Sequence, residues 1–497
     1  MPKRATTYLP PLERPLRART RQRDLYELLR AAILDRRLRP GSRVPSTREL
    51  AREYGVARGT VVTVYGQLIS EGYLSGRVGA GTVVSETLPD ELLSRGLPPQ
   101  PRTATAAHAS LKPMLARRSR LFDESPFPLK PAALAGQAFV AHRPALDAFP
   151  VKLWARVASS RLRRLSGASL ADGDPRGDAR LRQVIAAYLG SARGVRCEVD
   201  QVFILSGTQQ ALELAARLVL DPGDTAWVED PGYPGASRVL QASGAVLCPV
   251  PVDEEGLCVS AGEDTAPRAR LACVTPAHQA PLGVAMSLPR RLALLDWARR
   301  RRAWVFEDDY DSEYRYESRP LPALQGLDTL GCVLHAGSFS KTLFPSLRLG
   351  YLVVPHSIVD LVARARSLVD RYPGVLTQAV LADFIEDGHY ARHLRRMREL
   401  YAERREALAR SVSHRLAGAL TLPDGGAGLD TVGWLGAGFK DQAVVTAAAE
   451  HRVFLEPLSR YRVQARLPQG VLLGFASLSV RKIDEGVMRL ARVLDGR

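Results

Sequence analysis

The feature that most restricts the fold of this chain is a repeated order of apolar run, polar turn and helical stretch between residues 201 and 341. Runs with the composition of buried strands end in Gly, Asp or Ser, and a helical pattern follows. These runs are Gln201 to Leu205, Thr225 to Val228, Ala303 to Phe306 and Cys332 to His335. Repetition of this order predicts an α/β sheet, and polar residues gather at the strand ends, where such folds bind ligands.

Polar residues of distinct chemistry follow these predicted strands. Ser206-Gly207-Thr208-Gln209 opens a helix, so its backbone N–H groups and the helix dipole suit a phosphate. Asp308 follows an apolar strand, where a buried carboxylate needs a cationic partner. Tyr310 lies close to it, and Tyr233 follows an Asp-Pro-Gly turn.

Lys341 is an amine among candidate phosphate ligands, because Ser338 and Ser340 precede it and Arg348 follows seven residues later. The whole set meets the needs of pyridoxal phosphate, which requires an amine for its aldehyde and a carboxylate for its ring nitrogen. It also requires a donor for its phenolic oxygen, an aromatic ring to stack on, and donors for its phosphate. Singly, each signal is weak, since a lone lysine is usually a surface residue and Gly-Thr-Gln is usually a helix cap. Their combination in this order favours a cofactor site.

This order resembles the fold-type I, class I aminotransferases, and the resemblance is continuous over residues 135–490. It is carried further by Asp172-Gly173-Asp174-Pro175-Arg176-Gly177, Leu181-Arg182, Thr275 to Gly283, Gly350-Tyr351 and Gly474-Phe475-Ala476.

The resemblance implies a role for each candidate residue. Lys341 would bind the cofactor as a Schiff base, Asp308 would bind the pyridinium, Tyr310 the phenolic oxygen, and Tyr233 would stack on the ring. The phosphate would be held by Gly207, Thr208, Gln209, Ser338, Ser340 and Arg348. Arg460 is a candidate for an effector carboxylate, because a guanidinium binds it bidentately; a surface arginine is the alternative.

Two positions depart from the family pattern. The chain has His278-Gln279 where many aminotransferases have an asparagine that contacts the cofactor. Gly235 stands where an arginine is expected in the γ-aminobutyrate-responsive member, so the resemblance does not support γ-aminobutyrate as the effector.

The first 85 residues differ from the rest of the chain in their concentrated positive charge. They carry 16 basic and 7 acidic side chains, about half of the net charge of +17. Apolar residues at helical spacing predict helices over 24–34, 46–54 and 57–71, and residues 73–84 read as a hairpin. Ser46 and Glu49 form a capping-box pattern. This order predicts a winged helix-turn-helix that presents the small residues of its third helix to the major groove of DNA.

The N-terminal segment resembles the GntR family of regulators through Leu38 to Gly41, Pro45 to Ala51, Val56 to Val61 and Glu71 to Leu74. The family pattern implies DNA contacts at Arg48 and Arg58, with Thr60 beside them and Gly79 in the wing. Arg43 can neutralise a phosphate. A helix-turn-helix used only for protein contact is the alternative, which the concentrated positive charge disfavours.

Nearly the whole chain therefore resembles the MocR/GabR family of pyridoxal-phosphate-dependent transcriptional regulators. We expect a winged helix at 18–85, a linker at 86–130 and an aminotransferase-like effector domain at 131–497. The resemblance implies a cytoplasmic, head-to-tail homodimer that binds double-stranded operator DNA and senses an amino compound or the cofactor itself. A working aminotransferase with an autoregulatory DNA-binding domain is the competing hypothesis. A third, a protein that coats DNA by charge alone, leaves the cofactor set unexplained.

The sequence gives no support for a membrane protein, a secreted protein or a metal-binding protein. No apolar run approaches the roughly 20 residues of a membrane helix, and no apolar segment of a secretion signal follows the basic N-terminus. The five cysteines have no C-x-x-C spacing and read as free thiols, so we expect neither disulfides nor a metal site.

Overall fold

The computed structural model describes residues 21–77, 81–88, 115–123, 125–127, 137–167, 171–316 and 321–495. The chain divides into two compact units, residues 1–114 and 115–497. Each unit has a hydrophobic core of its own.

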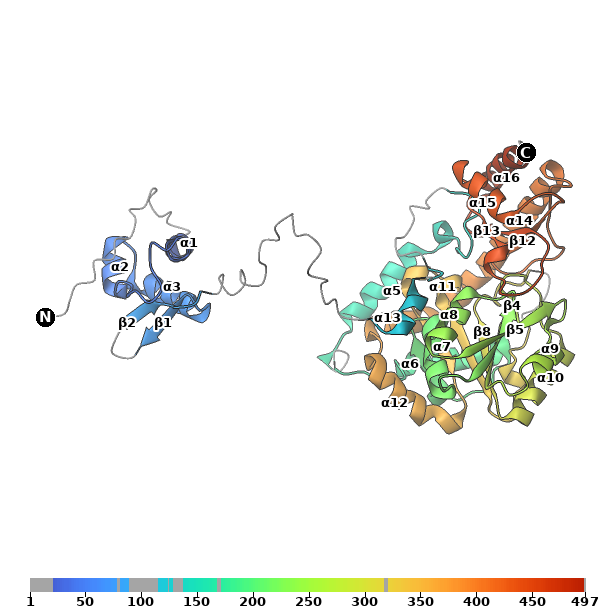
Figure 1. The fold of residues 1–497 in the computed structure, drawn as a ribbon, viewed down its shortest axis with the longest axis horizontal. Coiled ribbons are helices and arrows are strands. Elements are labelled where there is room, and N and C mark those ends of the chain that lie inside the picture. The colour runs from blue at the N-terminus through green and yellow to red at the C-terminus, as the bar shows by residue number, and fades with distance from the viewer. Residues whose placement is uncertain are drawn as a thin grey trace, which may run out of the picture. The chain divides into compact units, whose positions relative to one another are not determined.

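The first unit has the predicted order of helix, helix, short turn, helix and hairpin (Figure 1). Its helices are α1 (Arg21–Leu34), α2 (Thr47–Glu53) and α3 (Arg58–Ser70). The strands β1 (Leu74–Arg77) and β2 (Gly81–Val84) pair antiparallel. The wing residue Gly79 lies outside the described residues. The prediction of a winged helix-turn-helix is confirmed.

Local sequence and core packing explain these elements. The Ser46 side chain accepts a hydrogen bond from the Glu49 backbone N–H, and the Glu49 carboxylate accepts one from the Ser46 backbone N–H at 2.9 Å. This capping box satisfies donors that α2 cannot satisfy itself and contributes about 0.5–2 kcal/mol. All three helices and β2 bury apolar side chains in one cluster, which includes Leu25, Leu29, Leu50, Val61, Val64, Leu68 and Val84.

The second unit is built on an eight-stranded sheet with the order β3-β10-β9-β8-β7-β4-β5-β6. The five strands from β9 to β5 in this order run parallel, whereas β10 is antiparallel to both of its neighbours and β6 is antiparallel to β5. The strands are β3 (Val202–Leu205), β4 (Thr225–Asp230), β5 (Val246–Asp253), β6 (Gly256–Leu257), β7 (Leu271–Val274), β8 (Trp304–Asp309), β9 (Val333–Ser338) and β10 (Gly350–Val353). The predicted α/β architecture is confirmed.

Helices cover both faces of this sheet (Figure 1). One buried cluster joins the sheet to α7 (Thr208–Val219), α8 (Pro234–Ala242) and α12 (Val359–Asp370). Against the other face, Trp297 stacks on Trp227 with ring centroids 3.9 Å apart. The helices of this face include α6 (Ala179–Arg193), α9 (Val259–Thr265), α10 (Leu288–Arg301) and α13 (Val375–Glu386).

A smaller antiparallel sheet follows near the C-terminus, with the order β11-β12-β14-β13. Its strands are β11 (Leu420–Thr421), β12 (Asp430–Leu435), β13 (Glu456–Pro457) and β14 (Gly470–Gly474), and its helices are α15 (Asp441–Glu450) and α16 (Val480–Asp495). Helix α5 (Val151–Arg163) precedes the large sheet in the chain, and the 27-residue helix α14 (His389–Arg415) precedes the small one. Within the segment predicted as a linker, residues 117–122 form a short 3-10 helix.

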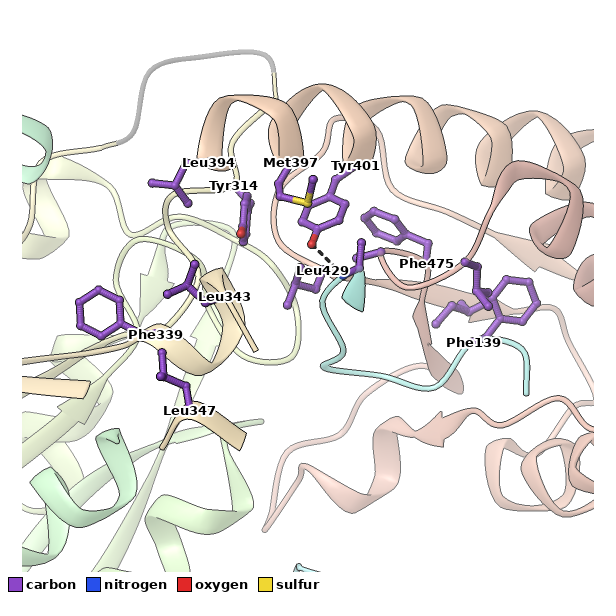
Figure 2. Close-up of a cluster of buried hydrophobic side chains, with 14 of the residues drawn as sticks. Phe139, Tyr314, Phe339, Leu343, Leu347, Leu394, Met397, Tyr401, Leu429 and Phe475 are labelled. Atoms are coloured by element: carbon purple, nitrogen blue, oxygen red, sulfur yellow. Dashed lines mark hydrogen bonds between the residues drawn. The ribbon is translucent and has the colours of Figure 1, made fainter. Parts of the chain in front are cut away.

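One buried cluster ties the two sheets together (Figure 2). Leu394, Met397 and Tyr401 of α14 share this cluster with Phe339 of the short helix α11 (Phe339–Thr342) and with Leu343, which follows that helix. Leu429 and Phe475, which flank strands β12 and β14 of the small sheet, belong to the same cluster. The Tyr401 hydroxyl accepts a hydrogen bond from the Ala145 backbone N–H at 2.9 Å. Because α11 contains Lys341, this cluster fixes the helix that carries the candidate amine.

Truncation of a core residue of α3 tests the first unit. Leu68 is fully buried, whereas its neighbour Ile69 is 41% exposed. We expect Leu68→Ala to lower the local stability by about 2–5 kcal/mol because it leaves a cavity. Hydrogen–deuterium exchange of the full chain measures this as faster exchange in α3, and Ile69→Ala is the matched control. Equal exchange in the two variants would contradict the packing described.

Candidate cofactor site and nucleic-acid interface

Strand β10 brings the predicted phosphate-binding segments together. Gly350 pairs with Leu205 of β3 on one side and with Ser338 of β9 on the other. The turn that begins with Ser206 therefore lies beside the turn that leads to Lys341. A Cβ at position 350 would lie 2.8 Å from the Gly207 Cα, so the start of β10 and the Gly207 turn are too close for a side chain between them.

These turns present donors suited to a phosphate. Gly207 has a φ of +137°, which favours glycine, and Thr208 and Gln209 follow as the first residues of α7. The Gln209 amide N–H₂ donates to the Gly235 carbonyl at 3.0 Å, while its buried oxygen has no partner among the described residues. The structure places these three predicted residues at a helix N-terminus, which attracts anions.

Ser338, Ser340 and Arg348 lie on the other side of the junction. The Ser338 hydroxyl accepts from the Ser340 backbone N–H at 3.1 Å and caps α11. Arg348 has a left-handed backbone with a φ of +50° and an exposed side chain, two residues before Gly350. The antiparallel pairing thus gathers residues from three separate segments.

Lys341 is half-buried, and its Nζ donates to the His142 carbonyl at 3.1 Å. Burial lowers the pKa of Lys341 below its ordinary value, although the carboxylates of Asp430, Asp311 and Glu456 oppose the shift. A lysine with a lowered pKa has a larger neutral fraction, and the neutral amine is the nucleophile that a carbonyl compound requires.

Asp308 lies at the end of β8, and its Oδ1 is buried without a hydrogen-bond partner among the described residues. Burial and then the neighbouring carboxylate of Asp309 raise the pKa of Asp308 to about 7. An orphaned buried carboxylate oxygen fits a ligand that brings a cationic N–H, as a protonated pyridine ring does. Asp308, Tyr233 and Thr275 line a small gap in the structure.

Tyr233 caps the start of α8, close to Asp308. A Cβ at Gly235 would lie 2.5 Å from its ring, so a larger residue at 235 would displace the phenol. The turn before it is fixed by Glu229, whose carboxylate accepts from the backbone N–H and hydroxyl of Thr275 at 3.1 and 2.6 Å. Gln279 donates to the Pro231 carbonyl at 2.8 Å and joins this network.

Tyr310 has one hydrogen-bond partner among the described residues, the His278 Nδ1 at 3.3 Å. The same nitrogen lies 2.8 Å from the Asp311 Oδ1. The two residues that depart from the aminotransferase pattern, His278 and Gln279, thus make separate contacts. The histidine faces Tyr310, and the glutamine holds the loop before Tyr233.

Sequence reasoning missed a group that surrounds Lys341. His142 donates from its backbone N–H to Asp430 at 2.7 Å and contacts the other Asp430 oxygen through Nδ1 at 2.8 Å. Its Nε2 lies 3.1 Å from the Tyr461 hydroxyl, which donates to Glu456 at 2.6 Å. A φ of +62° at His142 is the local feature that turns its carbonyl to Lys341, and a sequence pattern does not reveal it.

Arg460, the candidate for an effector carboxylate, is 42% exposed at its side chain and contacts Glu456 at 3.5 Å. It also donates to the Pro126 carbonyl. These contacts use some of the N–H donors of the Arg460 guanidinium. A cavity of about 520 Å³ lies instead beside Tyr310 and His142, and it is also lined by His278, Arg315, Arg405, Asp430 and Leu472.

In the first unit the candidate DNA contacts lie on the surface. Arg43, Arg48 and Arg58 are exposed, and Thr60 is half-buried. The outer face of α3 is formed by Gly59, Val62, Thr63 and Gly66, all of them exposed. Small residues on a recognition helix allow close approach to base edges, while the arginines suit phosphates and guanines.

Comparison with known proteins identifies both units. Residues 21–84 match the family "Bacterial regulatory proteins, gntR family", and residues 149–467 match "Aminotransferase class I and II". The "Probable rhizopine catabolism regulatory protein MocR" of Rhizobium meliloti is 41% identical over 94% of this chain and 92% of that protein. The chain belongs to the MocR-type transcriptional regulators.

Other relatives and solved structures agree. The regulator TauR of Rhodobacter capsulatus is 34% identical over 95% of this chain and 96% of its own. The α-aminoadipate aminotransferase LysN of Thermus thermophilus, solved with N-(5'-phosphopyridoxyl)-L-leucine, has a TM-score of 0.67 at 28% identity over 73% of this chain and 93% of its own. This MocR-type protein is therefore a DNA-binding regulator whose large domain is of the pyridoxal-phosphate-dependent aminotransferase type.

The residues present fit this cofactor. The orphaned Asp308 oxygen, the Gly207 turn and the half-buried Lys341 match its ring nitrogen, phosphate and aldehyde in turn. When bound, pyridoxal phosphate supplies an aldehyde that condenses with amines and a ring that withdraws electrons from them. The protein's part would be to orient the group, with Tyr310 and Asp308 as the residues that would exchange hydrogen bonds with it.

The described ranges contain neither a membrane-spanning helix nor a cluster of metal ligands. None of the helices there combines the length and apolar character needed to cross a bilayer. No three His, Cys, Asp or Glu side chains of the described residues come together as a metal site would need.

The buried Asp308 predicts a pH dependence of the cofactor-free protein. Its folded pKa of about 7 exceeds the unfolded value of about 4, so the folded chain binds this proton more tightly. Its contribution to stability is present below about pH 4 and is lost as pH rises to about 7. We expect Asp308→Asn to remove this loss, measured as the pH slope of the free energy of unfolding. Asp221→Asn, exposed in a surface turn, is the control, and identical slopes in all three proteins would contradict the assignment.

Proposed function

We propose that this MocR-type regulator senses an amino compound, or pyridoxal phosphate itself, through the site around Lys341. The observation that supports the proposal is the strand order β3-β10-β9-β8, in which the Gly207 turn, the segment of Lys341 and the orphaned Asp308 oxygen come at the ends of β3, β9 and β8. In this proposal Lys341 binds the cofactor covalently, Asp308 binds its ring nitrogen, Tyr310 its phenolic oxygen and Tyr233 its ring face. The phosphate ligands are Gly207, Thr208, Gln209, Ser338, Ser340 and Arg348.

The effector would enter the cavity of about 520 Å³ beside Tyr310 and His142. The carboxylates of Asp430 and Glu456 act on Lys341, so the part of the site near this lysine favours a cationic amine over an anion. An amine that displaces Lys341 changes the charge and the contacts around the ring. A ligand shifts a conformational equilibrium only through such differential contacts, so this exchange is the event that the DNA-binding unit would read.

The remaining parts of the proposal concern assembly and location. The chain would act in the cytoplasm, where its DNA is, as a head-to-tail homodimer in which residues 86–130 connect a winged helix at 18–85 to an effector domain at 131–497. Dimers of helix-turn-helix proteins bind half-sites related by the protein's own symmetry. Arg43, Arg48, Arg58, Thr60 and Gly79 would contact the operator.

A catalytic aminotransferase is the second candidate. The observation that favours it is the likeness to solved aminotransferases, among them the kynurenine aminotransferase of Pyrococcus horikoshii, with a TM-score of 0.67 at 25% identity over 77% of this chain and 95% of its own. Lys341 is placed to move a proton, as turnover requires. The two candidates differ in the number of reaction cycles per site.

Removal of the Arg58 side chain tests the DNA contact. We expect Arg58→Ala to weaken operator binding and to lower the slope of log affinity against log salt by about one, because one phosphate contact is lost. Arg37→Ala is the matched control, since Arg37 is paired with Asp35 at 2.9 Å. Titration of labelled operator DNA at several salt concentrations gives both quantities. An unchanged affinity and slope would remove Arg58 from the interface.

A panel of amines and amino acids tests the sensor. We expect the protein to gain a near-visible absorption band with pyridoxal phosphate, Lys341→Ala to lack it, and an effector to change it without sustained release of keto product. If Arg460 binds a carboxylate, Arg460→Gln should lower the affinity for amino acids more than the affinity for amines of equal length. A normal band in Lys341→Ala would overturn the cofactor assignment. Many turnovers per site at cellular rates would favour the aminotransferase.

A further inference from the structure

His278 forms a hydrogen-bonded chain with Asp311 and Tyr310 at the edge of the cofactor site. Its Nδ1 lies 2.8 Å from the Asp311 Oδ1 and 3.3 Å from the Tyr310 hydroxyl. Asp311 is 2% exposed, and the His278 side chain is 11% exposed. Asp311 and His278 are therefore largely withdrawn from solvent and Tyr310 is half-buried, so the hydrogen bonds among the three strongly influence where their protons lie.

Two glycines hold the imidazole ring in its orientation. Gly428 has a φ of +73°, and a Cβ there would lie 2.3 Å from the His278 Cε1 and 2.6 Å from the Asp311 Oδ2. Gly283 has a φ of +77°, and a Cβ there would lie 3.2 Å from the His278 Nε2. The backbone closes on both edges of the ring, which leaves it little freedom to rotate away from Asp311 and Tyr310.

The carboxylate fixes the direction of these hydrogen bonds. An ionised Asp accepts hydrogen bonds and cannot donate them, so the His278 Nδ1 that faces Asp311 must carry the proton. The Tyr310 oxygen faces the same N–H and is an acceptor there. Its own O–H is consequently left to donate elsewhere, and Tyr310 lines the cavity beside the Lys341 site.

Charges around His278 keep that proton in place. Burial lowers the pKa of His278, but the facing Asp311 carboxylate and the more distant Asp430 outweigh it, against a smaller opposing effect of Arg315, so the net pKa is raised. Burial raises the pKa of Tyr310 well above its ordinary value, and the carboxylates of Asp311, Asp430, Asp308 and Glu229 add to this. The phenol thus keeps its proton throughout the pH range in which a cofactor is titrated.

We propose that His278, held by Asp311, is a positioning residue that turns the Tyr310 hydroxyl proton toward the phenolic oxygen of the bound cofactor. The proposal rests on the role of Tyr310 proposed above and adds a residue to which no cofactor or effector role was given. A hydrogen bond donated to an anionic oxygen stabilises the anion. His278 therefore controls, through Tyr310, the pH at which the bound cofactor changes its absorption spectrum.

The test is a pH titration of the absorption of the cofactor bound to the full-length protein. Tyr310→Phe, which removes the donor, should raise the midpoint by about one pH unit, a tenfold change in the ionisation constant. His278→Leu should reproduce most of this shift, and the double variant should show little more than Tyr310→Phe alone, because His278 acts through the hydroxyl. His278→Gln, whose amide N–H can face both Asp311 and Tyr310, should restore most of the wild-type midpoint.

Controls separate this role from a structural one. His278→Ser leaves room for water beside Asp311 and serves if the leucine variant does not fold. His356→Leu, at an exposed histidine away from the site, should leave the midpoint unchanged. The proposal is overturned if His278→Leu and His278→Ser bind the cofactor with the wild-type midpoint, or if the Tyr310→Phe shift adds fully to theirs. A titrating wild-type band that Tyr310→Phe does not move would instead refute the role of Tyr310, and this proposal with it.

Discussion

The contact between backbone atoms of Gly350 and Gly207 is the constraint on which the rest of the site depends. Strand β10 is antiparallel to both β3 and β9, and at Gly350 it joins the turns that follow these strands. With a Cβ at this point, the Gly207 turn would have to move, and the N-terminus of α7 would shift with it. The lysine is held from the other side by the cluster of α11 and α14, so the amine and the anion-binding turn are fixed independently.

Buried ion pairs lie next to Asp308 and hold the neighbouring acidic residues of β8. Arg193 is fully buried and pairs with Asp309 at 2.8 Å, while His335 contacts Glu307 at 2.9 Å. On β8, Glu307 and Asp309 alternate with Asp308, so the two carboxylates that have cationic partners lie on one side of the strand and Asp308 lies on the other. Breaking a buried pair costs about 3–5 kcal/mol. Asp308 Oδ1 has no hydrogen-bond partner among the described residues, which leaves that atom available to a ligand.

Sequence patterns predicted those parts of the molecule that are local along the chain. The winged helix, the α/β sheet and the residues that follow each strand, such as Asp308 and Lys341, are set by periodicity and by the position of a strand end. His142, Asp430 and Tyr461 were not predicted, because they approach Lys341 from segments more than 85 residues away in sequence. Their placement depends on the docking of the small sheet.

The packing of Gly235 under the Tyr233 ring has a consequence for how such regulators diverge. A single substitution there displaces the aromatic ring before it can contribute a new ligand contact. A change of effector through this position therefore requires a second, compensating change in the Tyr233 turn, which Glu229 and Gln279 hold rigidly. The cavity proposed for the effector is also lined by His278, Arg315 and Ala427, which belong to other segments of the chain. Under the proposed function, a change of effector would therefore arise more readily through those segments than through position 235.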